Sequence, residues 1–307
     1  MNKTSLRCGT VTSTPLTRAE IETLLDDSIL DGDKLDVIDG VTTWDRLFPH
    51  RLLFADRFDE RIVKAINATA EESILFVASR DYETAVTTPR LISDYPRSVY
   101  AKIVRLLFRD RFTTQSQAIH PTAIIHPTAL LSPGVVIGAY SSVGESTIIH
   151  PNVVIAGSVH IGAYCQIKSG TVIGQPGFGI YRDERGLPNP LPHVAGVVIG
   201  DHVDLGALNT VVGGTIHPTV VEAYVKTDDH VHIAHNCHVG SKTLLTACVE
   251  LSGSVRLGEE CWLGPNSSVR DGIEIGDRAF VGIGSVVTKS VPADTTVFGT
   301  PARPRQK

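Results

Sequence analysis

The sequence predicts a mainly β protein: a parallel β-helix preceded by a small α/β domain. An aliphatic residue recurs at every sixth position over two long stretches of the chain. A period of six fits neither an α-helix nor a single alternating strand, whereas hexapeptide repeats are typical of a parallel β-helix. The aliphatic positions are Ile119, Ile125, Leu131, Ile137, Val143, Ile149, Ile155, Ile161, Ile167 and Ile173, and then Ile233, Val239, Leu245, Leu251, Leu257, Leu263, Val269, Ile275, Val281 and Val287.

The composition narrows the class of protein. At 307 residues the chain has room for about two domains of ordinary size. Aromatic residues make up only 6% of it, which suits a narrow core filled by Val, Ile and Leu. The formal net charge of −5 argues against sequence-independent binding of nucleic acid, which needs a basic surface.

The sequence also indicates where the protein is found. It has no apolar run of the ~18 residues that a membrane-spanning helix needs. Its first residues lack the apolar segment of a secretory signal. The cysteines are scattered, odd in number and without a CxxC pair, as is usual in a reducing compartment. We therefore expect a cytoplasmic protein without a membrane span. The five cysteines are Cys8, Cys165, Cys237, Cys248 and Cys261.

Residues 1–115 lie outside the repeat and predict the small α/β domain. Thr17 and Glu20 have the spacing of a capping box, which predicts a short helix running through Leu24 and Leu25. Two brief apolar runs suit buried strands, and two segments have apolar residues at helical spacing. These elements are strands at 52–55 and 74–77 and helices at 59–66 and from Pro96 onward.

The β-helix domain is expected over residues 116–292, followed by a C-terminal tail at 293–307. Two breaks interrupt the repeat. Residues 174–197 are rich in Gly, Pro and charge and predict a loop that leaves the coil, and residues 213–216 are a four-residue insertion. In a solenoid, loops that leave one face commonly build the binding site.

His-Pro pairs recur in the repeats and could suggest a metal site. Proline cannot donate to a strand ladder and belongs at corners or edges, so we interpret these histidines as corner residues remote from catalysis. The pairs are His120-Pro121, His126-Pro127, His150-Pro151 and His217-Pro218.

The most informative stretch is His232-Ile233-Ala234-His235-Asn236. Because three six-residue segments make one turn, Gly253 and Asp271 should stack on His235 in one column. A glycine beside an imidazole leaves its backbone amide approachable, as an oxyanion site requires. A histidine is a suitable base for an amine or hydroxyl that attacks a thioester. Asp228 and Asp229 could orient its other ring nitrogen.

Two other interpretations of these histidines remain open. They could be solvated side chains on a strand edge. A zinc site could be formed by His230, His232, His235 and His238, although alternate residues of a strand point to opposite faces and two of them belong to successive sides of the triangle. We expect no metal.

The chain resembles the UDP-3-O-acylglucosamine N-acyltransferase family of lipid A synthesis. The resemblance is carried by Gly177-Phe178-Gly179, Val198-Ile199-Gly200-Asp201 and His232-Ile233-Ala234-His235-Asn236. It implies a left-handed β-helix, a homotrimer with active sites between neighbouring subunits, and an N-terminal domain that helps to hold the uridine nucleotide. It further implies that His235 is the general base and the Gly253 amide the oxyanion donor. The residues implied to bind the nucleotide sugar are Phe54, Phe58, Phe178, Gly179 and Asn236.

The C-terminal part departs from that family. Asp271-Gly272 stands where the family has Gly-His, and the ending Gly-Thr-Pro-Ala-Arg303 is similar to that of sugar acetyltransferases that use acetyl-CoA. In those enzymes glycines follow the pantetheine and basic residues meet the phosphates. The implied acyl-donor-binding residues are Gly282, Gly284, Lys289, Gly299 and Arg303, with Arg305 beyond them.

We therefore predict an N-acyltransferase that moves a short acyl group from an acyl-CoA co-substrate to the amine of a nucleotide-linked amino sugar, for a bacterial surface polysaccharide or lipopolysaccharide. No permanently bound cofactor is expected. One alternative is a lipid A UDP-3-O-(3-hydroxyacyl)glucosamine N-acyltransferase that uses acyl carrier protein. Another is a non-catalytic scaffold that binds a nucleotide sugar.

Overall fold

The computed structural model describes residues 13–24, 29–31, 36–68, 74–86, 88–112 and 116–304. The described chain divides into two compact units. An α/β unit comprises residues 13–112 together with 178–192, and a β-helix unit comprises residues 116–177 and 193–304. Part of the predicted loop thus groups with the α/β unit. No helix in the described ranges is long and apolar enough to cross a membrane.

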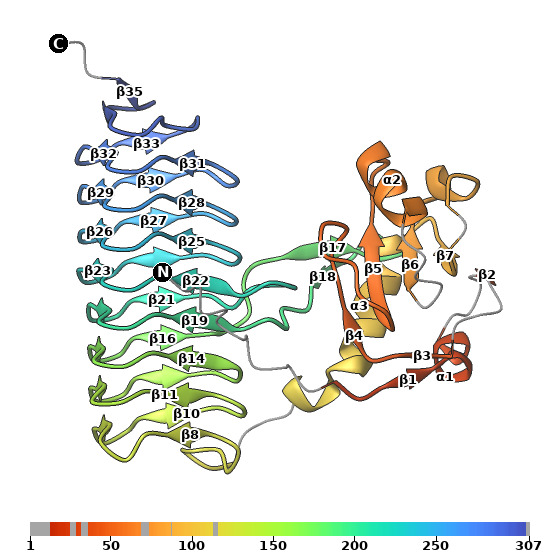
Figure 1. The fold of residues 1–307 in the computed structure, drawn as a ribbon, viewed down its shortest axis with the longest axis horizontal. Coiled ribbons are helices and arrows are strands. Elements are labelled where there is room, and N and C mark those ends of the chain that lie inside the picture. Colours follow the sequence, from red (N-terminus) through yellow and green to blue (C-terminus); the bar gives the residue numbers. More distant parts are fainter. Residues whose placement is uncertain are drawn as a thin grey trace. The chain divides into compact units, whose positions relative to one another are not determined.

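The β-helix unit is a stack of coils whose strands form three parallel sheets, here named faces A, B and C, which the chain visits in that order (Figure 1). Face A contains β10 (Val136–Ile137), β13 (Val154–Ile155), β16 (Val172–Ile173), β21 (Thr210–Val211), β24 (His232–Ile233), β27 (Glu250–Leu251), β30 (Ser268–Val269) and β33 (Val286–Val287). Face B contains β8 (Ile124–Ile125), β11 (Ser142–Val143), β14 (Val159–Ile161), β19 (Val197–Ile199), β22 (Thr219–Val221), β25 (His238–Val239), β28 (Arg256–Leu257) and β31 (Glu274–Ile275). Face C contains β9 (Leu130–Leu131), β12 (Ile148–Ile149), β15 (Gln166–Ile167), β20 (Asp204–Leu205), β23 (Lys226–Thr227), β26 (Leu244–Leu245), β29 (Trp262–Leu263), β32 (Phe280–Val281), β34 (Thr296–Phe298) and the antiparallel β35 (Arg303–Pro304).

The sixth-position aliphatic residues fill the interior of the coils, as the repeat predicts. Ile233 pairs with Leu251 in the next coil, and Leu251 pairs with Val269 in the one after. Each of these side chains is at most 1% exposed. Burial of one such side chain contributes roughly 1.5–3 kcal/mol, so the regular stack provides a stable support for its corners. The predicted parallel β-helix is confirmed.

Most corners between faces contain one residue in the left-handed backbone region. Asn236 has φ 61°, Ser254 has φ 61° and even Leu208 has φ 55°. This conformation is unfavourable for residues other than glycine. The turn is compensated by a hydrogen bond to the preceding coil, as when the Ser254 amide donates to the His235 carbonyl at 2.9 Å. The corners therefore hold their side chains in fixed, repeating positions.

The three faces together form a three-sided prism, and each of its edges is named after the two faces that meet there (AB, BC and CA). Both breaks in the repeat lie at the AB edge. The first insertion, residues 174–196, follows β16, and the second, residues 212–218, follows β21. The first contains the hairpin of β17 (Ile180–Arg182) and β18 (Pro188–Pro190), which belongs to the α/β unit. The two insertions are joined by backbone bonds, from the Gly213 amide to the Gln175 carbonyl at 2.9 Å and from the Ala195 amide to the Gly214 carbonyl at 3.1 Å.

The α/β unit contains a five-stranded sheet in the order β2-β7-β6-β5-β4, in which β2 alone is antiparallel. Its strands are β2 (Ile29–Asp31), β4 (Gly40–Val41), β5 (Arg51–Ala55), β6 (Leu75–Ala78) and β7 (Arg90–Ile92), beside a separate pair of β1 (Leu16–Thr17) and β3 (Val37–Ile38). Its helices are α1 (Arg18–Thr23), α2 (Glu60–Ala68) and α3 (Pro96–Leu107), with the 3₁₀ turns η1 (Arg80–Tyr82) and η2 (Arg109–Phe112).

The sequence-based expectations for this unit hold with small shifts of boundary. The capping box of Thr17 and Glu20 is present at the start of α1. The helix ends at Thr23, earlier than expected, and Leu25 lies outside the described residues. The hairpin of the first insertion packs on α3, where Ser98 Oγ donates to a Glu184 carboxylate oxygen at 3.0 Å.

Candidate active site

The AB edge brings His235, Gly253, Asp271 and Lys289 into one column on successive coils. His235 lies between β24 and β25, and Gly253 lies between β27 and β28. The Gly272 amide donates to the Gly253 carbonyl at 3.0 Å, which continues the stack toward Asp271. The column that the spacing predicted is therefore present, at the edge that also contains both insertions.

Gly253 lies directly against the imidazole ring of His235. A Cβ atom built on Gly253 would be 2.7 Å from Cε1 and 2.8 Å from Nε2 of that ring. Side-chain atoms do not approach so closely, so the space beside Nε2 exists only because residue 253 is a glycine. Among the described residues no hydrogen-bond partner is recorded for the Gly253 amide. The backbone of Gly253 and the Nε2 side of the ring thus lie next to each other at this edge.

Asn236 fixes the other side of the ring. Its side-chain Nδ2 donates to the His217 carbonyl at 3.1 Å, and its Oδ1 accepts from the Thr215 hydroxyl at 3.1 Å. A carbonyl can only accept, so this network determines which atom of the amide is the oxygen. His235 Nδ1 lies 3.0 Å from that oxygen and must donate to it. The neutral ring therefore has its proton on Nδ1, which leaves Nε2 as a base.

The expectation that Asp228 and Asp229 orient His235 is wrong in this structure. Both lie at the CA edge, between β23 and β24, and not at the AB edge. Asp229 Oδ1 accepts from the Ala207 amide at 2.7 Å, and an Asp228 carboxylate oxygen accepts from the Asp229 amide at 2.9 Å. One hexad separates two edges of the triangle, so residues six or seven positions before His235 support a different corner. The orienting group is Asn236.

A second histidine, which the sequence did not suggest, contacts the site. The ring of His193 lies 5.2 Å from that of His235, centroid to centroid, with an angle of 70° between the planes. His193 ends the predicted loop and is only 6% exposed. Gly177, from the start of the same insertion, lies beside both rings. The position of His193 after a run of Pro and Leu was the only signal, and it did not connect this residue with His235.

The other histidines of the central stretch are dispersed. His230 lies at the CA edge, His232 on face A and His238 on face B. Burial lowers the pKa of His232, although the neighbouring Glu250 opposes that shift. His238 Nε2 is 2.9 Å from a Glu222 carboxylate oxygen. No group of three or more potential metal ligands gathers anywhere in the described ranges.

The neighbouring thiol of Cys237 is also unsuited to chemistry. It is 1% exposed, and burial raises its pKa to about 12, so it stays protonated at neutral pH. A nucleophilic cysteine requires the opposite shift. The imidazole of His235 is thus the better candidate for proton transfer at this corner.

The corner interpretation of the His-Pro pairs holds for three of the four. His120, His126 and His150 lie at corners or ends of the regular coils, and His120 and His126 each contact the threonine two residues later at 2.9 Å. His217 is different. It lies in the second insertion, and its carbonyl holds Asn236 as described above. The His-Pro pattern alone could not separate it from the others.

The expected acyl-donor residues lie on more than one part of the prism. Lys289 is at the AB edge above His235, between β33 and the bridge of Val291 to Ile275. Gly282, Gly284 and Gly299 follow strands of face C at the CA edge, and Arg303 lies in β35. Arg305 is outside the described residues. Of the expected acyl-donor residues that the structure describes, Lys289 alone shares an edge with His235 within one chain.

The residues expected to hold the nucleotide belong mainly to the α/β unit. The Phe54 ring lies 4.9 Å from that of Tyr100, and the Phe58 ring lies 5.1 Å from that of Tyr82. Phe178 is 91% exposed, and Gly179 follows it in the hairpin segment of that unit. Asn236 belongs to the β-helix unit, where its polar atoms hold His235 and the second insertion. Its expected role in sugar binding remains a prediction.

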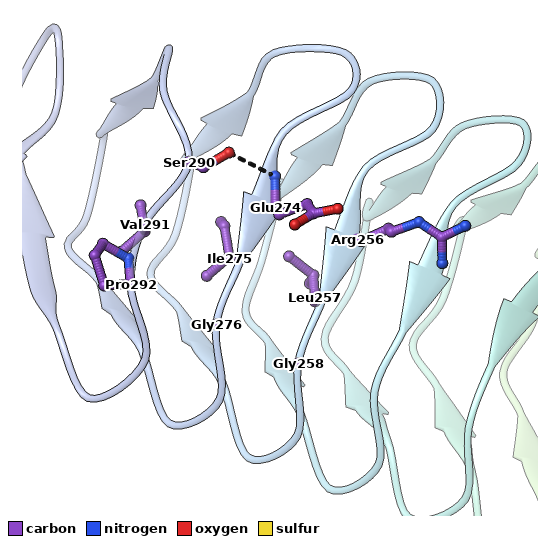
Figure 2. A pocket seen from close by; sticks show the side chains of 9 residues that line it. All are labelled: Arg256, Leu257, Gly258, Glu274, Ile275, Gly276, Ser290, Val291 and Pro292. Carbon is purple, nitrogen blue, oxygen red and sulfur yellow. Dashed lines mark hydrogen bonds between the residues drawn. The ribbon is translucent and has the colours of Figure 1, made fainter. Parts of the chain in front are cut away.

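An open cavity of ≈ 470 Å³ lies away from His235, toward the last coils. Figure 2 shows Arg256, Glu274 and Ser290 along its wall on successive coils, with the Ser290 hydroxyl bonded to the Glu274 amide at 3.2 Å. The cavity also includes Gly258, Gly276 and Pro292, so it extends to the BC edge. Because it does not include His235 or Gly253, we do not identify it as the place of chemistry.

Comparison with known proteins agrees with the β-helix fold. The family described as bacterial transferase hexapeptide, six repeats, matches residues 140–175 and 254–289. A UDP-3-O-acylglucosamine N-acyltransferase of Herminiimonas arsenicoxydans is 37% identical over 129 residues, and one of Janthinobacterium sp. (strain Marseille) is 36% identical over 129 residues. Each alignment covers 41% of this chain and 37% of the relative. The matched region thus spans well under half of these relatives.

The structure of LpxA from Acinetobacter baumannii has a TM-score of 0.50 with 26% identity and covers 62% of this chain and 74% of that protein. This chain contains bacterial transferase hexapeptide repeats, and over part of its length it is similar to UDP-3-O-acylglucosamine N-acyltransferases.

Proposed function

We propose that this protein transfers an acyl group from a thioester to the amino group of a nucleotide-linked amino sugar. The observation that carries the proposal is the arrangement of Asn236 and Gly253 around the His235 ring. Asn236 holds Nδ1 as a donor, and Gly253 leaves the space beside Nε2 open. A base with a free lone pair next to a backbone donor is what transfer to an amine requires.

The reaction would proceed as follows. The neutral sugar amine attacks the thioester carbonyl carbon, and His235 Nε2 takes a proton from the amine as the new C–N bond forms. The negative charge on the carbonyl oxygen is stabilised by the Gly253 amide. The carbonyl re-forms as the C–S bond breaks, and His235 returns the proton to the thiolate. The products are an amide and a thiol, and the base is restored.

The relatives favour one acceptor over others. Their names specify a UDP-glucosamine that already carries an O-linked acyl group. We therefore infer that the acceptor is of the UDP-3-O-acylglucosamine type. The relatives thus support the lipid A alternative better than the short-chain enzyme that the C-terminal sequence suggests. The acyl donor would be a thioester of either acyl carrier protein or CoA. We propose that Lys289, which lies at the AB edge, meets the acidic carrier or a phosphate.

The decisive experiment is mass spectrometry of the products formed with a panel of acceptors and donors. The acceptors are UDP-3-O-acylglucosamine and other nucleotide-linked amino sugars, and the donors are hydroxyacyl carrier protein, hydroxyacyl-CoA and acetyl-CoA. We expect an N-acylated product with the O-acylated acceptor. Transfer only from acetyl-CoA to other amino sugars would favour the short-chain enzyme, and no transfer with any pair would leave a binding scaffold.

A change at Asn236 tests the orientation of the base. In Asn236→Asp the carboxylate still accepts from His235 Nδ1 but stabilises the protonated imidazolium form by its negative charge. The reaction needs the neutral ring. As the pH is lowered, the variant should therefore lose activity at a higher pH than the wild type does. The measurement is the acidic limb of the pH profile of kcat/KM.

Asn266→Asp is the matched control for this change. Asn266 occupies the same left-handed corner position, with φ 57°, but lies at the CA edge. The Asn266→Asp variant should leave the pH profile of kcat/KM unshifted. Equal profiles for Asn236→Asp and the wild type would mean that His235 is not the titrating base.

A further inference from the structure

His193 and His235 come from different kinds of segment. His235 lies on a regular corner of the coil, whereas His193 closes the first insertion. Their rings meet edge to face, 5.2 Å apart and inclined by 70°. The contact therefore links the base to the part of the chain that departs from the repeat.

The known contacts of the His235 ring do not fully restrain it. The hydrogen bond from Nδ1 to Asn236 sets one point, but the ring can still tilt about that bond. On the side of Cε1 and Nε2, Gly253 offers no side chain. The restraint on tilting must therefore come from the remaining side, near Cδ2.

Two residues lie on that side. A Cβ atom built on Gly177 would be 3.0 Å from His235 Cδ2 and 3.0 Å from His193 Nε2, so the backbone of Gly177 lies under the junction of the two rings. His193 itself is 6% exposed. The following amide, that of Val194, donates to the Thr215 carbonyl at 2.9 Å. Thr215 also holds Asn236, so both restraints on His235 belong to one connected backbone.

We propose that His193 is a positioning residue that holds the His235 ring in the orientation in which Nε2 faces the acceptor amine. The proposal rests on the proposed acyl transfer. His193 acts through the edge of its ring and not by exchanging a proton with the substrate, since His235 alone lies beside Gly253. A misplaced base reacts slowly even when its substrate is bound, because catalysis depends on near-attack geometry.

The test compares His193→Ala, which removes the ring, with His193→Phe, which keeps a ring of similar shape without nitrogen atoms. We expect His193→Ala to lower kcat by about 10- to 100-fold, the scale of a displacement of about 1 Å, with little change in the acceptor KM. His193→Phe should recover most of kcat. Val212→Ala is the matched control, because Val212 Cγ1 lies 2.9 Å from the same built Cβ of Gly177.

An NMR measurement is independent of turnover. In protein labelled with ¹⁵N-histidine, the wild type and His193→Phe should each show one sharp set of His235 ring signals with the proton on Nδ1. His193→Ala should show broadened or averaged signals. If the wild type transfers no acyl group, the proposed function fails, and these spectra still decide whether His193 orders the ring.

Three results would overturn the role of His193. They are an unchanged kcat and sharp spectrum in His193→Ala, an equal loss in His193→Phe, and a loss that lies in the acceptor KM. A comparable fall of kcat in Val212→Ala would also overturn it, because general loosening around Gly177 would then explain the effect.

Discussion

His235→Ala should lower kcat by at least ~100-fold, because removal of a positioned general base costs about 10²–10⁴-fold. The acceptor KM should change little, since the change removes only the group that accepts the proton. The fold should persist, because His235 projects from a corner and the interior residues Ile233 and Leu251 remain. Steady-state kinetics with the best thioester and acceptor pair, together with thermal unfolding, measure both effects.

Histidines elsewhere on the prism are the controls for this change. His126→Ala removes an exposed ring whose Nδ1 contacts the hydroxyl and amide of the neighbouring Thr128, and it should retain wild-type kcat. His232→Ala and His238→Ala should cost far less than His235→Ala, because these side chains lie on faces A and B and not at the AB edge. An active His235→Ala enzyme, or a larger loss from His232→Ala, would assign the base elsewhere.

The repeat made the β-helix predictable because it has a direct physical meaning. An aliphatic residue at every sixth position can be buried only if the chain turns after each short strand, and 18-residue stacking then follows. That stacking predicts Gly253 beside His235, and the structure has the same pair in contact. Residues separated by one whole coil can thus be paired from sequence.

The supporting residues could not be found in that way, because they come from the insertions. The segments 174–196 and 212–218 break the register, so spacing along the chain no longer gives a position in space. Thr215 and His217, which hold Asn236, and His193, which packs on His235, all lie in these segments. Asp228 and Asp229 show a related limit of spacing: they are close to His235 in sequence, but they lie at the CA edge and not at the AB edge.

The site therefore combines two sources of order. The regular coils supply His235 and Gly253 at fixed corner positions, and the insertions supply the groups that set the tautomer and tilt of the ring. Both insertions leave the prism at the same edge and bond to each other, so a change in either one should reach His235. The residues of the α/β unit that we expect to bind the nucleotide can be tested separately, because binding and proton transfer can be altered independently.

Gly253→Ala should lower kcat by about 100-fold while it leaves the protein folded, because a displacement of about 1 Å in a catalytic group costs ~10²-fold. The added methyl group would be 2.7 Å from Cε1 and 2.8 Å from Nε2 of His235. The atoms in its way belong to the tip of a side chain, so the ring can swing aside and the backbone need not move. The methyl group also enters the space in which the thioester carbonyl meets the Gly253 amide. Base and oxyanion donor are thus disturbed together.

Ser254→Ala, at the next residue of the same corner, is the control, since Ser254 is exposed and already carries a Cβ in the left-handed conformation. It should keep wild-type kcat and an unfolding midpoint close to that of Gly253→Ala. Gly253→Val should be slower than Gly253→Ala, because a branched side chain fills more of the space beside Nε2. If Gly253→Ala kept full activity, the open space beside His235 would have no part in the reaction, and the oxyanion would have to be stabilised by another donor.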